Sequence, residues 1–137
     1  MTGDSPHVQE ALRWMRFANE DLDVAERLLR DDPVAARHVC WLSQQAAEKA
    51  IKAALTLDEV TFPFTHDLDA LRNLLPGAWA ARATPVDLAE LTEWGVESRY
   101  PGESPEPTAT EATRAGAEAR RGSSTPLSRI SKKARRH

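Results

Sequence analysis

Four side chains in the sequence could together hold a ligand that carries phosphate: Lys49, His66, Arg99 and Tyr100. Arginine offers a planar fork of donors that suits phosphate or carboxylate. A tyrosine ring can stack on a base. Lysine supplies a compact positive charge, and histidine changes its charge near neutral pH. We therefore expect a site for a small anionic ligand, such as a nucleotide, where these residues meet.

The surroundings of Lys49 leave two interpretations open. Lys52, three residues on, and Gln45, four residues before, share a helix face with Lys49. This face could be a polar, basic strip that holds phosphate oxygens. It could also be a solvated helix surface on which Glu48 and Lys52 form an ordinary i,i+4 ion pair, worth about 0.3–0.5 kcal/mol. We favour the second interpretation for Lys52 and keep both for Lys49.

The other two positions also have structural interpretations. His66 could be a first-turn residue beside a Thr65 cap, with no chemistry of its own. Arg99 could cover the last carbonyls of a helix or pair with Glu48, and Tyr100 could pack under the loop that follows. A binding role requires Arg99 and Tyr100 to lie alongside the middle of the segment from Gln45 to Lys52. There they would complete a cationic notch with Lys49.

Apolar side chains recur at spacings of three and four over most of the chain, which predicts helices. The candidate residues should therefore be held in place by helices. The spacing predicts helices over about Val8–Arg30, Val34–Leu57, His66–Leu75, Pro85–Ser98 and Thr108–Arg121. Asp31-Asp32-Pro33 should interrupt the first two, with one of the aspartates as the cap of the second. No strand pattern is present in the sequence. The expected fold is all-α, an antiparallel up-and-down bundle of four to five helices.

The C-terminal residues differ in composition from the rest of the chain. The fifth predicted helix has only alanine as its apolar content, and the stretch after it, from Gly122, is rich in Gly and Ser and then basic. We therefore expect a bundle over residues 1–121 and a basic, disordered tail over 122–137. Such a tail could attract RNA through its phosphates, or simply keep the chain in solution.

Composition narrows the classes of protein further. Seven basic residues and no acidic ones lie from Arg120 onward, so the remainder carries a net charge of −10, which favours a protein partner over non-specific nucleic-acid binding. No apolar run approaches the roughly 20 residues that span a bilayer, and the N-terminus lacks a signal-peptide pattern, so we expect a cytoplasmic protein without membrane contact. We predict that the single cysteine, Cys40, is a core residue. The Cys, His and carboxylate residues of the sequence do not have the spacing of a metal site. We expect neither a metal nor a cofactor.

Three local motifs, in this order and at these separations, resemble the HEPN domain, a family named for nucleotide binding in prokaryotes and higher eukaryotes. The first is Ser43-Gln44-Gln45-Ala46-Ala47-Glu48-Lys49-Ala50-Ile51-Lys52. The second is Thr65-His66-Asp67-Leu68, and the third is Glu97-Ser98-Arg99-Tyr100-Pro101. The resemblance extends over about Val8–Arg121. It implies a helical bundle like that of nucleotidyltransferase substrate-binding subunits, often paired into homodimers.

The resemblance also implies a choice of function. Some members are metal-independent RNase toxins with an Arg, four to six residues and then a His, whereas the positions at that distance from Arg99 are Ser104, Pro105 and Glu106. We therefore expect a non-catalytic homodimer that binds a nucleotide, or a small nucleotidyltransferase partner within a toxin–antitoxin-type pair. An RNase toxin that uses His66 and a plain dimerisation module are the alternatives. Arg99→Ala should weaken ligand binding without unfolding the chain.

Overall fold

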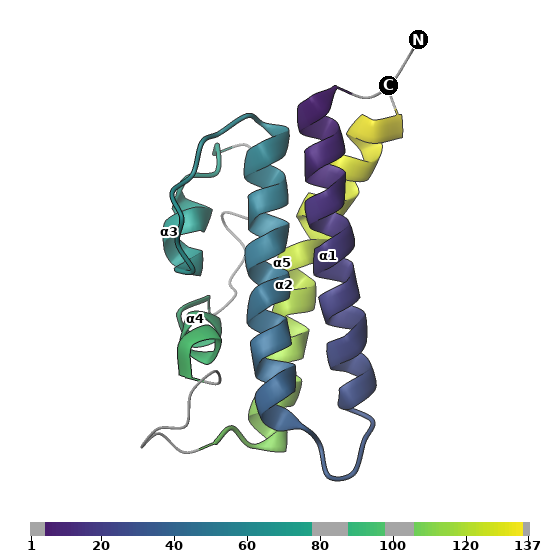
Figure 1. Ribbon diagram of the computed structural model, residues 1–137, viewed down its shortest axis with the longest axis vertical. Coiled ribbons are helices and arrows are strands. Elements are labelled where there is room, and N and C mark those ends of the chain that lie inside the picture. The colour runs from purple at the N-terminus through teal and green to yellow at the C-terminus, as the bar shows by residue number, and fades with distance from the viewer. Residues whose placement is uncertain (1–4, 78–87, 98–105, 136–137) are drawn as a thin grey trace.

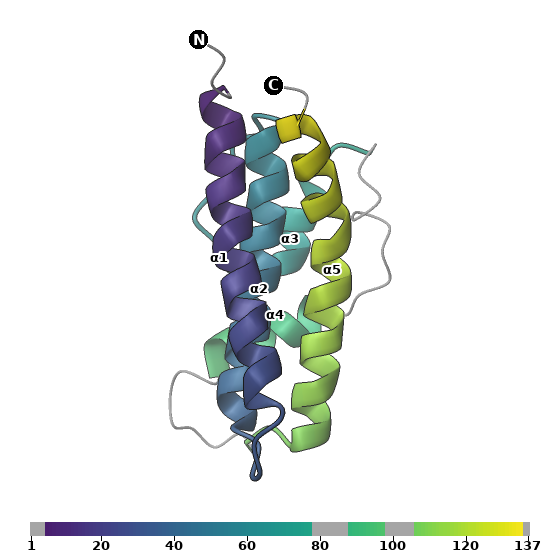
Figure 2. The same ribbon diagram turned by 90° about the vertical axis from the view of Figure 1, so that its right-hand side faces the viewer.

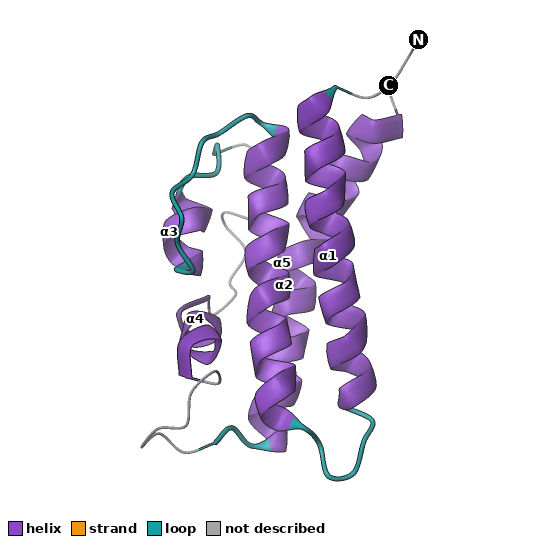
Figure 3. Cartoon of the chain, viewed as in Figure 1, coloured by secondary structure: helices purple, strands orange, loops and turns teal. Residues whose placement is uncertain are grey.

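The computed structural model describes residues 5–77, 88–97 and 106–135. Within these ranges the chain forms five helices and no strand. Their bounds are α1 Pro6–Leu28, α2 Ala36–Leu57, α3 Leu68–Asn73, α4 Leu88–Glu97 and α5 Ala109–Arg135. In Figure 3 the described residues outside the helices form loops and turns. The all-α bundle predicted from the periodicity is confirmed.

Helix α2 is the centre of the bundle, since each of the other four helices packs against it. The long helices α1, α2 and α5 stand side by side, and the short helices α3 and α4 cover the face of α2 that is turned away from α1 (Figures 1 and 2). The chain descends through α1 and ascends through α2, the loop after α2 descends to the start of α3, and α5 ascends (Figure 1). The neighbouring helices α1 and α2 are therefore antiparallel, whereas α5 runs in the same direction as α2.

The predicted core stripes lie where the periodicity placed them. On α1 the fully buried positions follow spacings of three and four: Val8, Ala11, Met15, Ala18, Leu22 and Ala25. On α2 burial extends almost all round the helix, because neighbours cover it on several sides. Its many alanines suit this position, since a side chain of one carbon lets neighbouring helices approach closely. The resulting core runs through all five helices.

Two predicted helix caps are wrong. Neither Asp31 nor Asp32 caps α2, which begins later, after Ala35, where the backbone N–H of Ala36 donates to the carbonyl of Val34 at 2.9 Å. Thr65 does not cap α3. Asp67 does, and its Oδ1 accepts from the N–H of Ala70 at 3.2 Å. The α3 helix is consequently shorter than predicted, beginning at Leu68.

Helix α5 is the largest departure from the sequence prediction. Its start is fixed by a reciprocal capping box: the N–H of Thr108 donates to Glu111 Oε1 at 3.0 Å, and the N–H of Glu111 donates to Thr108 Oγ1 at 3.1 Å. The helix was predicted to end at Arg121, before a disordered tail, but it continues to Arg135. Ser123 and Ile130 are buried, at 2% and 0% exposure. Tertiary packing of these two side chains outweighs the low helix propensity of Gly122 and its neighbours.

Substitution of Gly122 tests this continuation of α5. A Cβ added to Gly122 meets nothing within 4 Å, so Gly122→Ala should stabilise the chain by about 0.5–1 kcal/mol. Gly122→Pro should instead cost about 3 kcal/mol, because proline cannot donate within a helix. Gly116→Ala is the matched control, with its Cβ in ordinary contact 3.5 Å from Leu29 Cδ1. Urea unfolding measures all three, and an unchanged Gly122→Pro variant would contradict a helix that passes Arg121.

Candidate functional site

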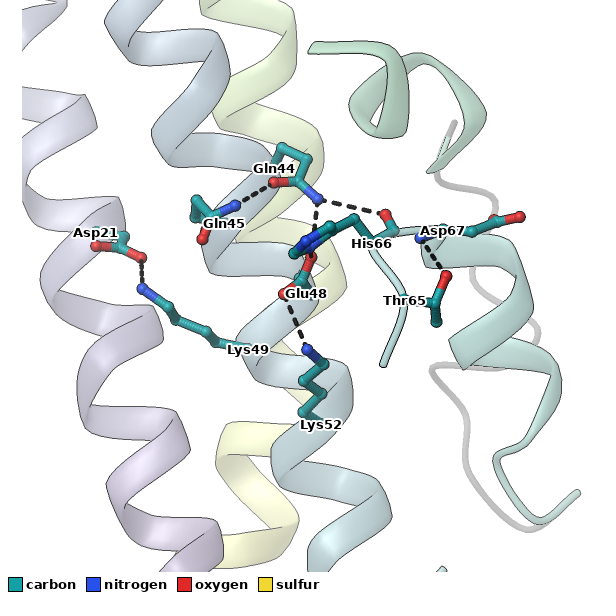
Figure 4. Close-up of polar contacts among 9 residues, drawn as sticks. All are labelled: Asp21, Gln44, Gln45, Glu48, Lys49, Lys52, Thr65, His66 and Asp67. Carbon is teal, nitrogen blue, oxygen red and sulfur yellow. Dashed lines mark hydrogen bonds and ion pairs between the residues drawn. The ribbon is translucent and has the colours of Figure 1, made fainter. Parts of the chain in front are cut away.

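A buried carboxylate organises the polar residues between α2 and the segment that precedes α3. Glu48 is 4% exposed, and Oε1 accepts from Gln44 Nε2 at 3.1 Å while Oε2 accepts from Lys52 Nζ at 3.0 Å. His66 Nδ1 lies 2.8 Å from Oε1. Figure 4 shows these contacts converging on Glu48. We refer to Gln44, Glu48, Lys52 and His66 as the Glu48 cluster.

The position of the Glu48 cluster follows from the spacing on α2. Gln44, Glu48 and Lys52 are successive i,i+4 neighbours and therefore lie on one face of the helix. His66 reaches this face from the loop before α3, where Thr65 Oγ1 accepts from the N–H of Asp67 at 3.1 Å. Gln44 Nε2 also donates to the carbonyl of His66 at 3.5 Å. Both the backbone carbonyl and the ring of His66 are thus hydrogen-bonded to side chains of α2.

Electrostatics keeps the Glu48 carboxyl ionised. Burial by itself raises the pKa of this group, but the hydrogen bonds from His66, Lys52 and Gln44 together outweigh burial, and the pKa lies below its ordinary value of 4.5. An ionised carboxylate only accepts hydrogen bonds, so His66 Nδ1 must be the donor. In the neutral imidazole the proton is then on Nδ1, and Nε2 carries a lone pair. With 41% of its side chain exposed, His66 can offer that nitrogen to a ligand.

Lys52 differs from the sequence interpretation in one respect. The predicted ion pair with Glu48 is present, but the solvated surface expected around it is wrong, because the two side chains are only 8% and 6% exposed. The ammonium group also lies 5.6 Å from the ring centre of Trp14 and 5.8 Å from that of Phe62. These rings stabilise the cation through their negative faces. Lys52 is therefore a structural charge within the Glu48 cluster.

Lys49 does not join the Glu48 cluster and instead points toward α1 (Figure 4). Its Nζ lies 2.6 Å from Asp21 Oδ2, and the two side chains are 23% and 19% exposed. Gln45, which was predicted to share a basic strip with Lys49, donates through Nε2 to Gln44 Oε1 at 2.7 Å. Within the described residues, the two lysines thus face different carboxylates.

The remaining predicted site residues, Arg99 and Tyr100, lie outside the described residues. Three residues with a direct part in the geometry were missed as site residues by sequence reasoning: Gln44, Glu48 and Asp21. Gln44, Glu48 and Lys52 follow one another at i,i+4 spacing on α2, and this pattern could have indicated that Glu48 accepts hydrogen bonds from both neighbours. The contacts of Asp21 and His66 with α2 join residues 28 and 18 positions apart, and no local pattern predicts them.

The loop before α3 exposes one aromatic ring beside the Glu48 cluster. Phe64 is 91% exposed and lies edge-on to His66, with the ring centres 5.4 Å apart. Phe62 behaves differently, since it is partly buried and packs on the core. Phe62 therefore holds the loop against the core, whereas Phe64 does not. The surface at His66 combines an imidazole with an adjacent apolar ring.

Cys40 and the acidic and histidine side chains are the other potentially reactive groups among the described residues. Burial, with smaller contributions from Glu111 and Glu90, raises the pKa of the Cys40 thiol to about 12, so it stays protonated at neutral pH and is no nucleophile. No group of three or more His, Cys, Asp or Glu side chains in this part of the chain could hold a metal ion. Among the same residues, no helix has the length and apolarity to cross a bilayer.

Comparison with known proteins assigns the family. The family model described as the HEPN domain matches residues 11–121, which is most of the chain. The match includes α2, the loop that carries His66, and α4. Comparison with curated proteins and with solved structures gave no match. On the strength of the family model and the helical bundle, this chain belongs to the HEPN domain family.

Proposed function

We propose that this chain is a non-catalytic HEPN protein that binds a nucleotide, or a small nucleotidyltransferase partner in a toxin–antitoxin-type pair. It does so as a homodimer, through the surface around His66. The observation that carries the proposal is the hydrogen bond between His66 Nδ1 and the buried Glu48 carboxylate. A ring held in this way loses little freedom when it binds, so less of the interaction energy is spent on ordering the side chain.

The surroundings of His66 fit a nucleotide in two respects. The exposed Phe64 ring offers a face on which a base can stack, while the imidazole can contact a phosphate oxygen. Gln45, Lys49, Arg99 and Tyr100 remain proposed contributors, as the sequence suggests. Lys49 would have to exchange Asp21 for a phosphate, which is possible because this ion pair is partly exposed.

A nucleotide titration tests the proposal. Isothermal titration with ATP and with AMP should show binding to the wild-type chain, and His66→Ala should weaken it about tenfold or more, the usual range for a hydrogen bond to a charged group. His38→Ala is the matched control, since His38 is exposed near the start of α2 and should leave affinity unchanged. Equal affinity in wild type and His66→Ala would remove His66 from the site.

The partner and the oligomeric state need separate measurements. Sedimentation of the wild-type chain should give a dimer mass. Co-purification with a small nucleotidyltransferase encoded beside this chain, reduced in His66→Ala, would support the partner form of the proposal. A dimer that binds neither nucleotide nor such a partner would leave a plain dimerisation module as the function.

The Glu48–His66 pair favours one second candidate, a metal-independent RNase. A carboxylate that orients an imidazole is the arrangement that general acid–base catalysis uses, because it fixes the tautomer and stabilises the protonated ring. Purified protein incubated with RNA in the presence of a chelator decides between the candidates. Cleavage by the wild type that is lost in His66→Ala and kept in His38→Ala would support the RNase function. Absence of cleavage by the wild type would exclude it.

A further inference from the structure

Helix α1 carries a second stripe of mostly apolar residues beside the stripe that faces the core. Its members follow one another at spacings of three and four and fall within an arc of about 80°: Trp14, Phe17, Asp21, Val24 and Leu28. Phe17 and Val24 are 41% and 36% exposed, and Trp14 and Leu28 are only partly buried. Single exposed apolar residues are common on protein surfaces, but a row at this spacing is the pattern by which one helix packs against another.

Helix α2 is uncovered along one stripe that adjoins this row. Beyond its first turn every residue of α2 is buried except five, which fall within an arc of about 100°: Trp41, Leu42, Gln45, Lys49 and Thr56. The stripes of the two helices meet where Lys49 Nζ lies 2.6 Å from Asp21 Oδ2. We call the two stripes together the α1–α2 face.

None of the other described helices covers the α1–α2 face. Helix α5 packs behind α1 and α2, and α3 and α4 lie on the side of α2 that is turned away from α1 (Figures 1 and 2). The two helices are 23 and 22 residues long, so their uncovered sides together measure about 33 Å by about 20 Å. Covering this area on two molecules removes about 1,300 Å² of surface from water, which is within the range of stable protein–protein interfaces.

Charge favours a second copy of the chain as the occupant. The residues before Arg120 carry a net charge of −10, so two copies repel each other over most of their surface. The α1–α2 face is neutral instead, because its two charged residues, Asp21 and Lys49, balance each other. A two-fold axis places the same patch on both partners, so the acid of one copy can face the base of the other in both halves of the contact. An ion pair is costly to place in lipid, and a face without net positive charge does not attract a polyanion.

We propose that the α1–α2 face is the contact through which two copies of this chain form a homodimer. This contact presupposes the homodimer of the proposed function and gives it a surface. Phe17, the most exposed large apolar side chain of the face, is its aromatic anchor, whereas Val24 is smaller, lies at the outer edge of its stripe and contributes little. The contact adjoins the Glu48 cluster, because Gln45 on the face donates to Gln44 Oε1 at 2.7 Å. The second copy therefore lies beside the surface around His66.

Sedimentation velocity over a concentration series measures the dissociation constant of the dimer. Phe17→Glu should raise this constant at least about 30-fold, because two-fold symmetry removes the ring from both copies and leaves two carboxylates in the contact. Leu74→Glu is the matched control, since Leu74 is 39% exposed, lies at the end of α3 and exchanges an apolar side chain for the same charge. It should dimerise like the wild type. Circular dichroism checks that both variants keep their helices.

Hydroxyl-radical labelling tests the contact on the wild-type chain, without any substitution. As the protein concentration rises through the dissociation constant, Phe17 should be labelled less, because the second copy covers its ring. Leu74 should be labelled equally at all concentrations. Labelling of Phe17 that does not change as the dimer forms would overturn the contact.

The outcomes separate this contact from the proposed function. Equal dimerisation of the wild type and Phe17→Glu would overturn the contact and leave the homodimer in place, and equal losses in Phe17→Glu and Leu74→Glu would overturn it as an effect of net charge. A wild-type chain that stays monomeric would overturn both; co-purification of a nucleotidyltransferase that Phe17→Glu abolishes would then assign the face to that partner. His66→Ala should dimerise like the wild type, so a loss of nucleotide binding is distinguished from a loss of dimerisation.

Discussion

Replacement of Glu48 by alanine is expected to destabilise the folded chain by about 3–5 kcal/mol, the range for removal of one partner of a buried ion pair. The variant leaves the Lys52 ammonium group buried, with two aromatic rings but no carboxylate. It also leaves His66 and Gln44 without their shared acceptor. Urea unfolding followed by circular dichroism measures the effect. An exposed helix pair would cost only about 0.3–0.5 kcal/mol, so the measurement distinguishes the two environments directly.

The double variant E48Q/K52M supplies the control. It removes both charges and keeps the side-chain volumes close, so most of the lost stability should return. A Glu48→Ala loss under about 1 kcal/mol would contradict a buried cluster. Low pH should also destabilise the folded chain. Because the folded pKa of Glu48 is below 4.5, its contribution to the free energy of unfolding is fully present above that value and is lost as the pH falls through the folded pKa. The Glu48→Gln variant should lack this part of the acid dependence.

Leu22→Ala is expected to destabilise the chain by about 3–5 kcal/mol through a cavity at the meeting point of three helices. Leu22 is fully buried on α1 and packs with Ala46 of α2 and Ala119 of α5. Because both neighbours are alanines on separate helices, neither can move into the space that the leucine leaves. Thermal or urea unfolding measures the loss.

Val24→Ala is the matched control on the same helix. Val24 is 36% exposed, so its truncation should change the free energy of unfolding by no more than about 0.5 kcal/mol. If Leu22→Ala proved as mild as Val24→Ala, α5 would not pack across α1 and α2 at this height, and the three-helix core would be contradicted.

The sequence predicted those parts of the fold that depend on local pattern. The apolar spacing on α1 placed its buried stripe correctly, and the many alanines of α2 indicated close helix packing. The helical continuation of α5 beyond Arg121 could not be predicted from a local pattern. Its local residues are poor helix formers, and Ile130 is buried in the core cluster that the other helices help to form.

The candidate site was predictable to a smaller extent for the same reason. His66 and the residues of α2 were recognised from their types and order, yet Lys52 was expected on a solvated face. Whether an i,i+4 pair is exposed depends on what covers the helix, and the covering rings, Trp14 and Phe62, come from α1 and from the loop after α2. The role of Glu48 as the shared acceptor likewise arises only when the loop before α3 brings His66 against α2.

The orientation of His66 by Glu48 is the physical claim on which the proposed site depends. Long-range ¹H–¹⁵N NMR of the histidine rings reads the protonated nitrogen of His66 directly. At a pH where the ring is neutral, the wild-type chain should carry the proton on Nδ1. Glu48→Met, which keeps a similar side-chain length and removes both acceptor oxygens, should lose that preference while His38 is unchanged. A proton on Nε2 in the wild type, or a His66 spectrum that Glu48→Met leaves untouched, would contradict the claim.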